Sequence, residues 1–294
     1  MADPLTSARF RDRLEAFRRS VEPLVRRLRT LAPRPVGRGM VPEVESHRPY
    51  AFGDDPRFVD WNLYARFERF YVKTVVREED AGLALLVDAS ASMGEPDPER
   101  FRRAREVAAA LGYLTLYTGG VVTLWGWSRG LAGRWGPFEG PGGVAAFLQA
   151  AEALEPRGPT DLGAAVAGWA ARAAPGQKGA VVVSDLYTAE PVGRVLRPLV
   201  ARGVGVGVVQ LADPGDLAPL RRAGRYAVRD PESDAVVRRF VGYGLRRRLE
   251  AAWRRRQAEV EEGLRALTPW YVRSDARRRF EAVAREYLEA GLGR

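Results

Sequence analysis

Between residues 81 and 211, two patterns of apolar residues alternate along the chain. Short continuous apolar runs, typical of strands buried on both faces, are separated by longer stretches in which apolar residues recur at helical spacing. The runs are residues 83–87, 121–125, 179–183 and 204–211, and the helical stretches are 99–117, 143–154, 161–173 and 191–202. This alternation predicts an α/β fold, in which a doubly wound, mainly parallel sheet carries helices on both faces.

An amphipathic helix is predicted ahead of this region. Its apolar residues lie alternately four and three positions apart, which places them on one stripe of a helix. They are Phe10, Leu14, Phe17, Val21, Leu24, Leu28 and Leu31. We expect the stripe to pack on the chain's own C-terminal helix or main domain, with a short coiled-coil seam as the alternative. Pro23 lies inside the pattern and is expected to kink or restart the helix.

The other segments are less regular. Residues 43–73 mix aromatic, acidic and arginine residues without a clean period, which indicates a loop-rich insert with short strands. After residue 213 we expect a short strand near 226–228, a long helix, and a last helix over 275–290. The apolar positions of the long helix recur every four residues and are Val237, Val241, Leu245, Leu249 and Trp253.

The length of 294 residues fits one main domain with smaller attachments. We therefore divide the chain into four segments. Residues 1–36 form an N-terminal amphipathic helical segment, and residues 37–80 a loop-rich region with short strands. Residues 81–230 form the main α/β domain, and residues 231–294 form C-terminal helices that pack on its core.

Composition removes several classes of chemistry. The chain has no cysteine and one histidine, His47, so disulfides, thiol catalysis and histidine-rich metal sites are excluded. Any bound metal must therefore be held by oxygen. No apolar run approaches the roughly 18 residues of a membrane-spanning helix, and no secretory leader is evident, so the expected location is the cytoplasm.

The net charge of +10 comes almost wholly from arginine. It is compatible with nucleic acid, an anionic membrane or an acidic protein partner, and also with solvated arginine-rich helix faces. The strongest sign of nucleic-acid binding is Trp253 between the arginine runs 246–248 and 254–256. Because Trp253 belongs to the apolar stripe of its helix, we expect it to pack against the core or a neighbouring domain instead.

Candidate ligands for a metal follow the apolar run that ends at Val87. Asp88, Ser90 and Ser92 are spaced two apart, so in an extended segment their side chains would point the same way. They stand at the carboxyl end of a central strand, where open α/β sheets bind ligands. Alone, the string is weak, because serine and aspartate are common in turns and helix caps.

Two further oxygen donors strengthen the candidate. Thr160 precedes a predicted helix and Asp185 follows a predicted strand, so the topology should bring both near Asp88. Two carboxylates and three hydroxyls suit a hard divalent ion, which favours Mg²⁺, with Mn²⁺ or Ca²⁺ as possible substitutes. The carboxylates only balance the charge of the ion, which leaves it attractive to an incoming carboxylate.

These five residues resemble the metal-ion-dependent adhesion site of von Willebrand A domains, whose pattern is Asp-x-Ser-x-Ser followed by a threonine and an aspartate. The resemblance implies a Rossmann-like A-type fold for residues 81–230. It also implies direct coordination by Ser90, Ser92 and Thr160, with Asp88 and Asp185 often acting through water. An acidic residue of a bound protein partner would complete the coordination shell.

Residues 48–61, RPYAFGDDPRFVDW, are similar to the signature of the family called domain of unknown function fifty-eight. The similarity extends from about residue 37 to the C-terminus. It implies a non-enzymatic adaptor or chaperone-like cofactor that works with a MoxR-type AAA+ ATPase or its client. Within this signature, Asp54, Asp55 and Arg57 either belong to a structural ion-pair network or contribute to a partner-binding surface.

An enzyme is the main alternative. A Mg²⁺ site beside a strand-end aspartate is what phosphoryl or ester hydrolysis through an aspartyl nucleophile would need. The sequence lacks a glycine-rich phosphate loop, and Ser90 stands where such an enzyme would place a second acid. We therefore expect no catalytic residues and no small-molecule substrate.

Overall fold

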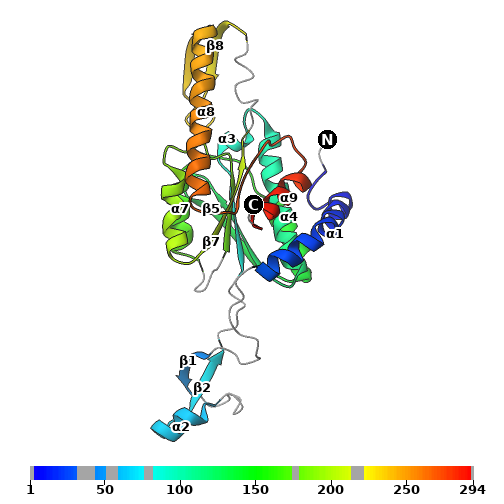
Figure 1. Cartoon of the computed structure of the whole chain (residues 1–294), viewed down its shortest axis with the longest axis vertical. Helices are drawn as coiled ribbons and strands as arrows, with labels where there is room; N and C mark the ends of the chain where they lie inside the picture. Colours follow the sequence, from blue (N-terminus) through cyan, green and yellow to red (C-terminus); the bar gives the residue numbers. More distant parts are fainter. Residues whose placement is uncertain are drawn as a thin grey trace.

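The computed structural model describes residues 3–31, 44–50, 59–75, 82–173, 179–212 and 222–292, and its centre is a six-stranded sheet (Figure 1). The strand order is β10-β7-β6-β3-β4-β5, and all neighbours are parallel except β4 and β5. The strands are β3 (Leu83–Asp88), β4 (Val121–Trp127), β5 (Leu131–Glu139), β6 (Gly179–Ser184), β7 (Gly205–Leu211) and β10 (Tyr271–Ser274). The predicted α/β class with a mainly parallel sheet is confirmed.

Helices cover both faces of this sheet, as predicted. Leu85 and Val87 of β3 face one core cluster, whereas Ala84 and Leu86 face the other, because successive strand residues point to opposite faces. The first cluster lies under α1 (Ala8–Leu31), α4 (Pro98–Tyr117), α5 (Val144–Glu152) and α9 (Phe280–Ala290). The second lies under α6 (Leu162–Ala170), α7 (Val192–Ala201) and α8 (Tyr243–Arg265). A 3₁₀ turn, η3 (Pro141–Gly143), leads into α5.

The N-terminal helix packs on the chain itself, which confirms that part of the prediction. Phe10, Leu14, Phe17 and Val21 are buried, and α1 contacts both α4 and α9. The ring centroids of Phe10 and Phe280 are 5.3 Å apart. The helix does not restart at Pro23, which lies inside one continuous α1.

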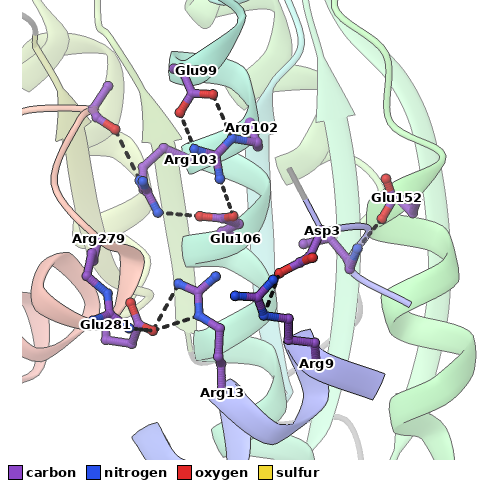
Figure 2. A network of polar contacts seen from close by, with 12 residues as sticks. Asp3, Arg9, Arg13, Glu99, Arg102, Arg103, Glu106, Glu152, Arg279 and Glu281 are labelled. Atoms are coloured by element: carbon purple, nitrogen blue, oxygen red, sulfur yellow. Dashed lines mark hydrogen bonds and ion pairs between the residues drawn. The ribbon is translucent and has the colours of Figure 1, made fainter. Parts of the chain in front are cut away.

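Arginine and glutamate side chains reinforce this three-helix contact (Figure 2). The Arg13 Nε of α1 donates to the Glu281 carboxylate of α9 at 3.0 Å, and its guanidinium lies 4.6 Å from the Phe280 ring centroid. On α4, the buried Glu106 pairs with Arg102 and Arg103. Arg103 also donates from Nε to the Ala276 carbonyl at 3.1 Å, so α4 is bonded to the segment that leads into α9.

A small unit formed by residues 44–50 and 59–75 lies apart from the main sheet in Figure 1. Its strands β1 (Val44–Pro49) and β2 (Tyr71–Val75) pair antiparallel, with α2 (Trp61–Phe67) between them in sequence. The Asp60 carboxylate caps α2 by accepting from the Asn62 and Leu63 amides. The two short strands agree with the sequence pattern, and α2 is an element that it did not predict.

The C-terminal region contains the short strand predicted near 226–228 and two further strands where the sequence predicted only helices. β8 (Gly224–Arg229) and β9 (Val236–Val241) form an antiparallel hairpin, and β10 extends the main sheet beside β7. The helical stripe beginning at Val237 was therefore wrong in its first part, since Val237 and Val241 belong to β9 and α8 begins at Tyr243. Residues four apart share a face in a strand as well as in a helix, so the spacing could not distinguish the two. Within the described ranges, no helix has both the length and the apolar character required to cross a bilayer.

Candidate metal centre

Asp88 is the last residue of β3, and its carboxylate is completely buried. Its Oδ1 accepts from the Ser90 amide at 2.9 Å, and its Oδ2 accepts from the Ser184 hydroxyl at 2.6 Å. Both of these donors are neutral. Burial, together with the negative charge of Asp185, raises the pKa of Asp88 well above its usual range, although the two donors oppose the shift.

The two serines lie where the strand turns into the short helix α3 (Ala91–Gly94). Ser90 has extended backbone angles and precedes the helix, whereas Ser92 lies inside it. Their Oγ atoms are 3.1 Å apart. The structure thus brings Asp88, Ser90 and Ser92 together, but through a strand-to-helix turn and not through the extended segment that the spacing argument assumed.

Asp185 follows β6, the strand next to β3, so both acids lie at the carboxyl ends of adjacent strands. The chain leaves β3 toward β4 and returns on its other side at β6, which makes this edge the topological switch point where ligands bind in open α/β sheets. Asp185 accepts from the Tyr187 amide at 3.0 Å and is buried.

Arg100 of α4 is a member of the site that sequence reasoning missed. Its Nη1 donates to Asp185 Oδ2 at 3.1 Å and to the Ser92 carbonyl at 3.3 Å, and the ion pair is buried. The guanidinium therefore links the two loops that carry the candidate ligands. A buried arginine on a helix has no distinctive sequence pattern, and so only the fold reveals it.

Thr160 lies on a loop bonded to the serine turn. The Ala91 amide donates to the Gly158 carbonyl at 2.8 Å, and the Arg157 amide donates to the Ala89 carbonyl at 2.7 Å. Thr160 itself meets a second residue that the sequence did not single out, Glu232 in the β8–β9 turn. The Thr160 amide donates to Glu232 Oε2 at 2.8 Å, and its hydroxyl donates to Oε1.

Helix α8 and strand β7 support Asp185 from behind. The buried Gln210 donates from Nε2 to the Asp185 carbonyl at 3.3 Å and to Gln257 Oε1 of α8 at 2.8 Å. The Trp253 indole donates to the Tyr187 hydroxyl at 2.6 Å, and Trp253 is half-buried. Trp253 thus contacts the loop after β6 but belongs to neither core cluster, so the predicted packing against the core is not confirmed.

The residues present fit a hard divalent ion. The described ranges contain no cluster of three or more His, Cys, Asp or Glu side chains, so a zinc-type site does not form within them. The candidate set instead has two carboxylates and three hydroxyls, a donor set suited to Mg²⁺. Asp88 and Asp185 are both buried, and the charge of Asp185 helps to raise the pKa of Asp88. A bound cation would relieve the repulsion between the two carboxylates. Asp54, Asp55 and Arg57, the candidate partner-binding residues, lie outside the described residues.

Comparisons with known proteins give the family. The sequence profile of the family described as "Protein of unknown function DUF58" matches residues 46–259. Curated proteins gave no match. A conserved hypothetical protein BatB from Bacteroides thetaiotaomicron shares 14% identity at a TM-score of 0.43, over 71% of this chain and 98% of its own.

Two further solved structures carry metals in their descriptions. Manganese-loaded TRAP protein from Plasmodium vivax shares 15% identity at a TM-score of 0.36, over 72% of this chain and 75% of its own. Proximal thread matrix protein 1 from the mussel byssus, with a zinc-occupied MIDAS motif, shares 18% identity at a TM-score of 0.37. That likeness covers 45% of this chain and 38% of the mussel protein.

Proposed function

The chain belongs to the DUF58 family, and from that premise we propose that it is a non-enzymatic adaptor that holds an acidic residue of a protein partner through a bound Mg²⁺. Asp88, Ser90, Ser92, Thr160 and Asp185 would hold the ion, and Mn²⁺ or Ca²⁺ could replace it. The partner would be a MoxR-type AAA+ ATPase or its client. Bound there, the ion would supply a positive charge with an open coordination position.

One observation carries this proposal. Two fully buried carboxylates and two serine hydroxyls meet at the switch point of a mainly parallel sheet, beside the loop that carries Thr160. Buried acids are costly unless a cation compensates them. Arg100 contacts Asp185, and the Asp88 carboxylate is bonded by neutral groups, which leaves negative charge for an ion to neutralise.

Calorimetric titration of MgCl₂ tests the metal site. The wild type is expected to bind Mg²⁺, and the double variant Asp88→Ala, Ser90→Ala is expected to lose binding. Ser92→Ala is the milder variant, because Ser92 is only half-buried and its loss should leave the fold intact. Asp12→Asn, which changes an exposed acid on α1, is the control and should bind as the wild type does. Equal Mg²⁺ affinity in all four proteins would overturn the proposed ligand set.

Partner binding is tested with a MoxR-type ATPase in Mg²⁺ and in EDTA. The proposal expects binding in Mg²⁺ that weakens at least about tenfold in EDTA and in Ser92→Ala, since the ion would bridge the two proteins. Binding that is equal with and without the metal would mean that recognition lies elsewhere. Steady hydrolysis of p-nitrophenyl phosphate that disappears in Asp88→Ala would overturn the non-enzymatic part and favour a Mg²⁺-dependent hydrolase.

A further inference from the structure

The turn between β8 and β9 places an acidic side chain of this chain on a candidate ligand of the site. Glu232 is half-buried and lies 72 residues from Thr160 in sequence, yet its two carboxylate oxygens meet the amide and the hydroxyl of that one residue. Charge-assisted hydrogen bonds of this kind are stronger than neutral ones. The chain thus supplies a carboxylate at a position where the proposed function expects one from a partner.

The turn is built to present this side chain. Asp230 organises it by accepting from the Glu232 amide at 3.0 Å and from the Ser233 hydroxyl at 2.5 Å. The Asp230 amide donates to the Ala235 carbonyl at 2.9 Å, which closes the turn. These bonds lower the pKa of Asp230, the Ser233 hydroxyl contributing most. The geometry of the tip is therefore fixed within the hairpin, independently of Thr160.

A second contact holds the hairpin beside the serine turn. Arg229, the last residue of β8, pairs with Glu95, which follows α3 directly. Glu232 and Arg229 thus contact the two loops that carry Thr160 and the serines. The rest of the hairpin is largely exposed: Val228, Val237 and Phe240 are 50%, 54% and 65% accessible. Among the described residues, Glu232 and Arg229 are the hairpin residues that bond to these two loops, so opening the hairpin breaks a small set of polar contacts.

On these grounds we propose that Glu232 is an internal ligand that competes with a partner's carboxylate for the site. The inference rests on the proposed metal-dependent function and adds its regulation. While the hairpin is closed, Glu232 occupies both donors of Thr160. The Thr160 hydroxyl oxygen keeps lone pairs when it donates its proton, so an ion and Glu232 can share it. A partner carboxylate gains access when the hairpin opens. The apparent affinity of the protein for its partner is therefore proportional to the fraction of molecules whose hairpin is open.

The test uses the full chain and two labelled peptides, one with a single glutamate between glycines and one with glutamine in its place. Glu232→Gln keeps the size of the side chain but offers one acceptor oxygen to the two Thr160 donors. In saturating Mg²⁺ it should bind the glutamate peptide at least about tenfold more tightly than the wild type. The glutamine peptide should show no gain, and neither peptide should gain in EDTA.

Asp234→Asn is the matched control. It removes one negative charge from the same turn, at an exposed position with φ +58 that asparagine tolerates. It weakens the exposed Arg229–Asp234 ion pair but leaves Glu232 and the Arg229–Glu95 pair in place. It should bind the peptides as the wild type does, and an equal gain in both variants would show that net charge, not Glu232, controls access. Amide hydrogen exchange at Thr160 should be faster in Glu232→Gln, because that amide donates to Glu232 Oε2 in the wild type.

Calorimetric titration of Mg²⁺ distinguishes a failure of the proposed metal-dependent function from a failure of the proposed role of Glu232. If the wild type does not bind Mg²⁺, the proposed metal-dependent function is overturned and this inference falls with it. If Mg²⁺ binds to wild type and Glu232→Gln alike but the gain for the glutamate peptide is absent, the role of Glu232 alone is overturned. Mg²⁺ binding together with a gain confined to Glu232→Gln and the glutamate peptide supports both.

Discussion

Ser184 shows how a residue outside the candidate ligand set shapes the site. Its hydroxyl donates to Asp88 Oδ2 at 2.6 Å and accepts from the Leu186 amide at 2.8 Å, and it is buried. One side chain therefore orients the first acid and fixes the turn that carries the second. Groups that orient metal ligands commonly matter nearly as much as the ligands themselves.

Replacing Ser184 tests this role. Ser184→Ala removes the hydroxyl that donates to Asp88 Oδ2 and accepts from the Leu186 amide, so the free energy of unfolding should fall by about 1–3 kcal/mol. Mg²⁺ affinity should fall on the order of tenfold or more. Urea unfolding and calorimetry measure the two effects. Thr118→Ala removes an exposed hydroxyl at the end of α4 and should change the free energy of unfolding by no more than about 0.5 kcal/mol.

At the scale of single residues, the sequence was sufficient to nominate candidate ligands but not to predict their contacts. The spacing of Asp88, Ser90 and Ser92, the predicted helix after Thr160 and the predicted strand before Asp185 sufficed to nominate these residues. The structure places them on adjoining loops. Arg100 and Glu232 were missed because their roles depend on contacts 85 and 72 residues away, which no local pattern encodes. Side chains that act through long-range contacts require the fold.

Between elements, Glu15 joins α1 to α4. Hydrogen bonds from Arg18, helped by those from Tyr113 and Arg19, lower the pKa of Glu15 from 4.5 to about 2. The Tyr113 hydroxyl of α4 is 2.9 Å from Glu15 Oε2. Because the folded-state pKa is below the unfolded one, this carboxylate stabilises the fold above pH 4.5 and loses that contribution as pH falls through about 2.

The comparison of wild type with Glu15→Gln should follow that sign. At neutral pH the wild type should be more stable by on the order of 1 kcal/mol, since the variant weakens several hydrogen bonds to a charged group. The difference should shrink steadily from about pH 5 to about pH 2, because the unfolded wild type takes up its proton near pH 4.5 and the folded carboxylate takes one up only near pH 2. Urea unfolding at several pH values measures it, and a difference that stays constant over this range would contradict the assignment.

The spacing of apolar residues predicted an element correctly where the pattern fits only a helix or only a strand. The continuous apolar strands of the sheet and the alternating four and three spacing of α1 have no competing interpretation, and the structure has these elements. The spacing of four from Val237 fits both a strand and a helix, so β9 was taken for the start of α8. β10 has only four residues, too short for a clear period, and its place beside β7 depends on the tertiary fold.

Across the whole molecule, the two ends of the chain share one core cluster. Phe280 of α9 is fully buried, and its ring centroid lies 5.3 Å from that of Phe10 and 6.1 Å from that of Phe17. The sequence predicted that α1 would pack within the chain but offered two surfaces for it. The structure shows that α4 and α9 together receive it.

Removing that ring should loosen both ends. Phe280→Ala is expected to lower the free energy of unfolding by about 3–5 kcal/mol, because it leaves a cavity between three elements. Amide exchange over residues 10–28 should become faster in the same variant. Phe240→Ala removes a ring that is 65% exposed and should cost no more than about 0.5 kcal/mol. Comparable losses in both variants would refute a shared core for α1 and α9.

The pairing of α1 with α9 also has a consequence during translation. The apolar stripe of α1 leaves the ribosome about 270 residues ahead of Phe280, one of the residues that cover it. At common rates of synthesis this interval is roughly half a minute. Throughout it α9 is absent and only α4 can pack on the stripe, so the nascent chain carries a partly exposed hydrophobic helix to which chaperones can bind.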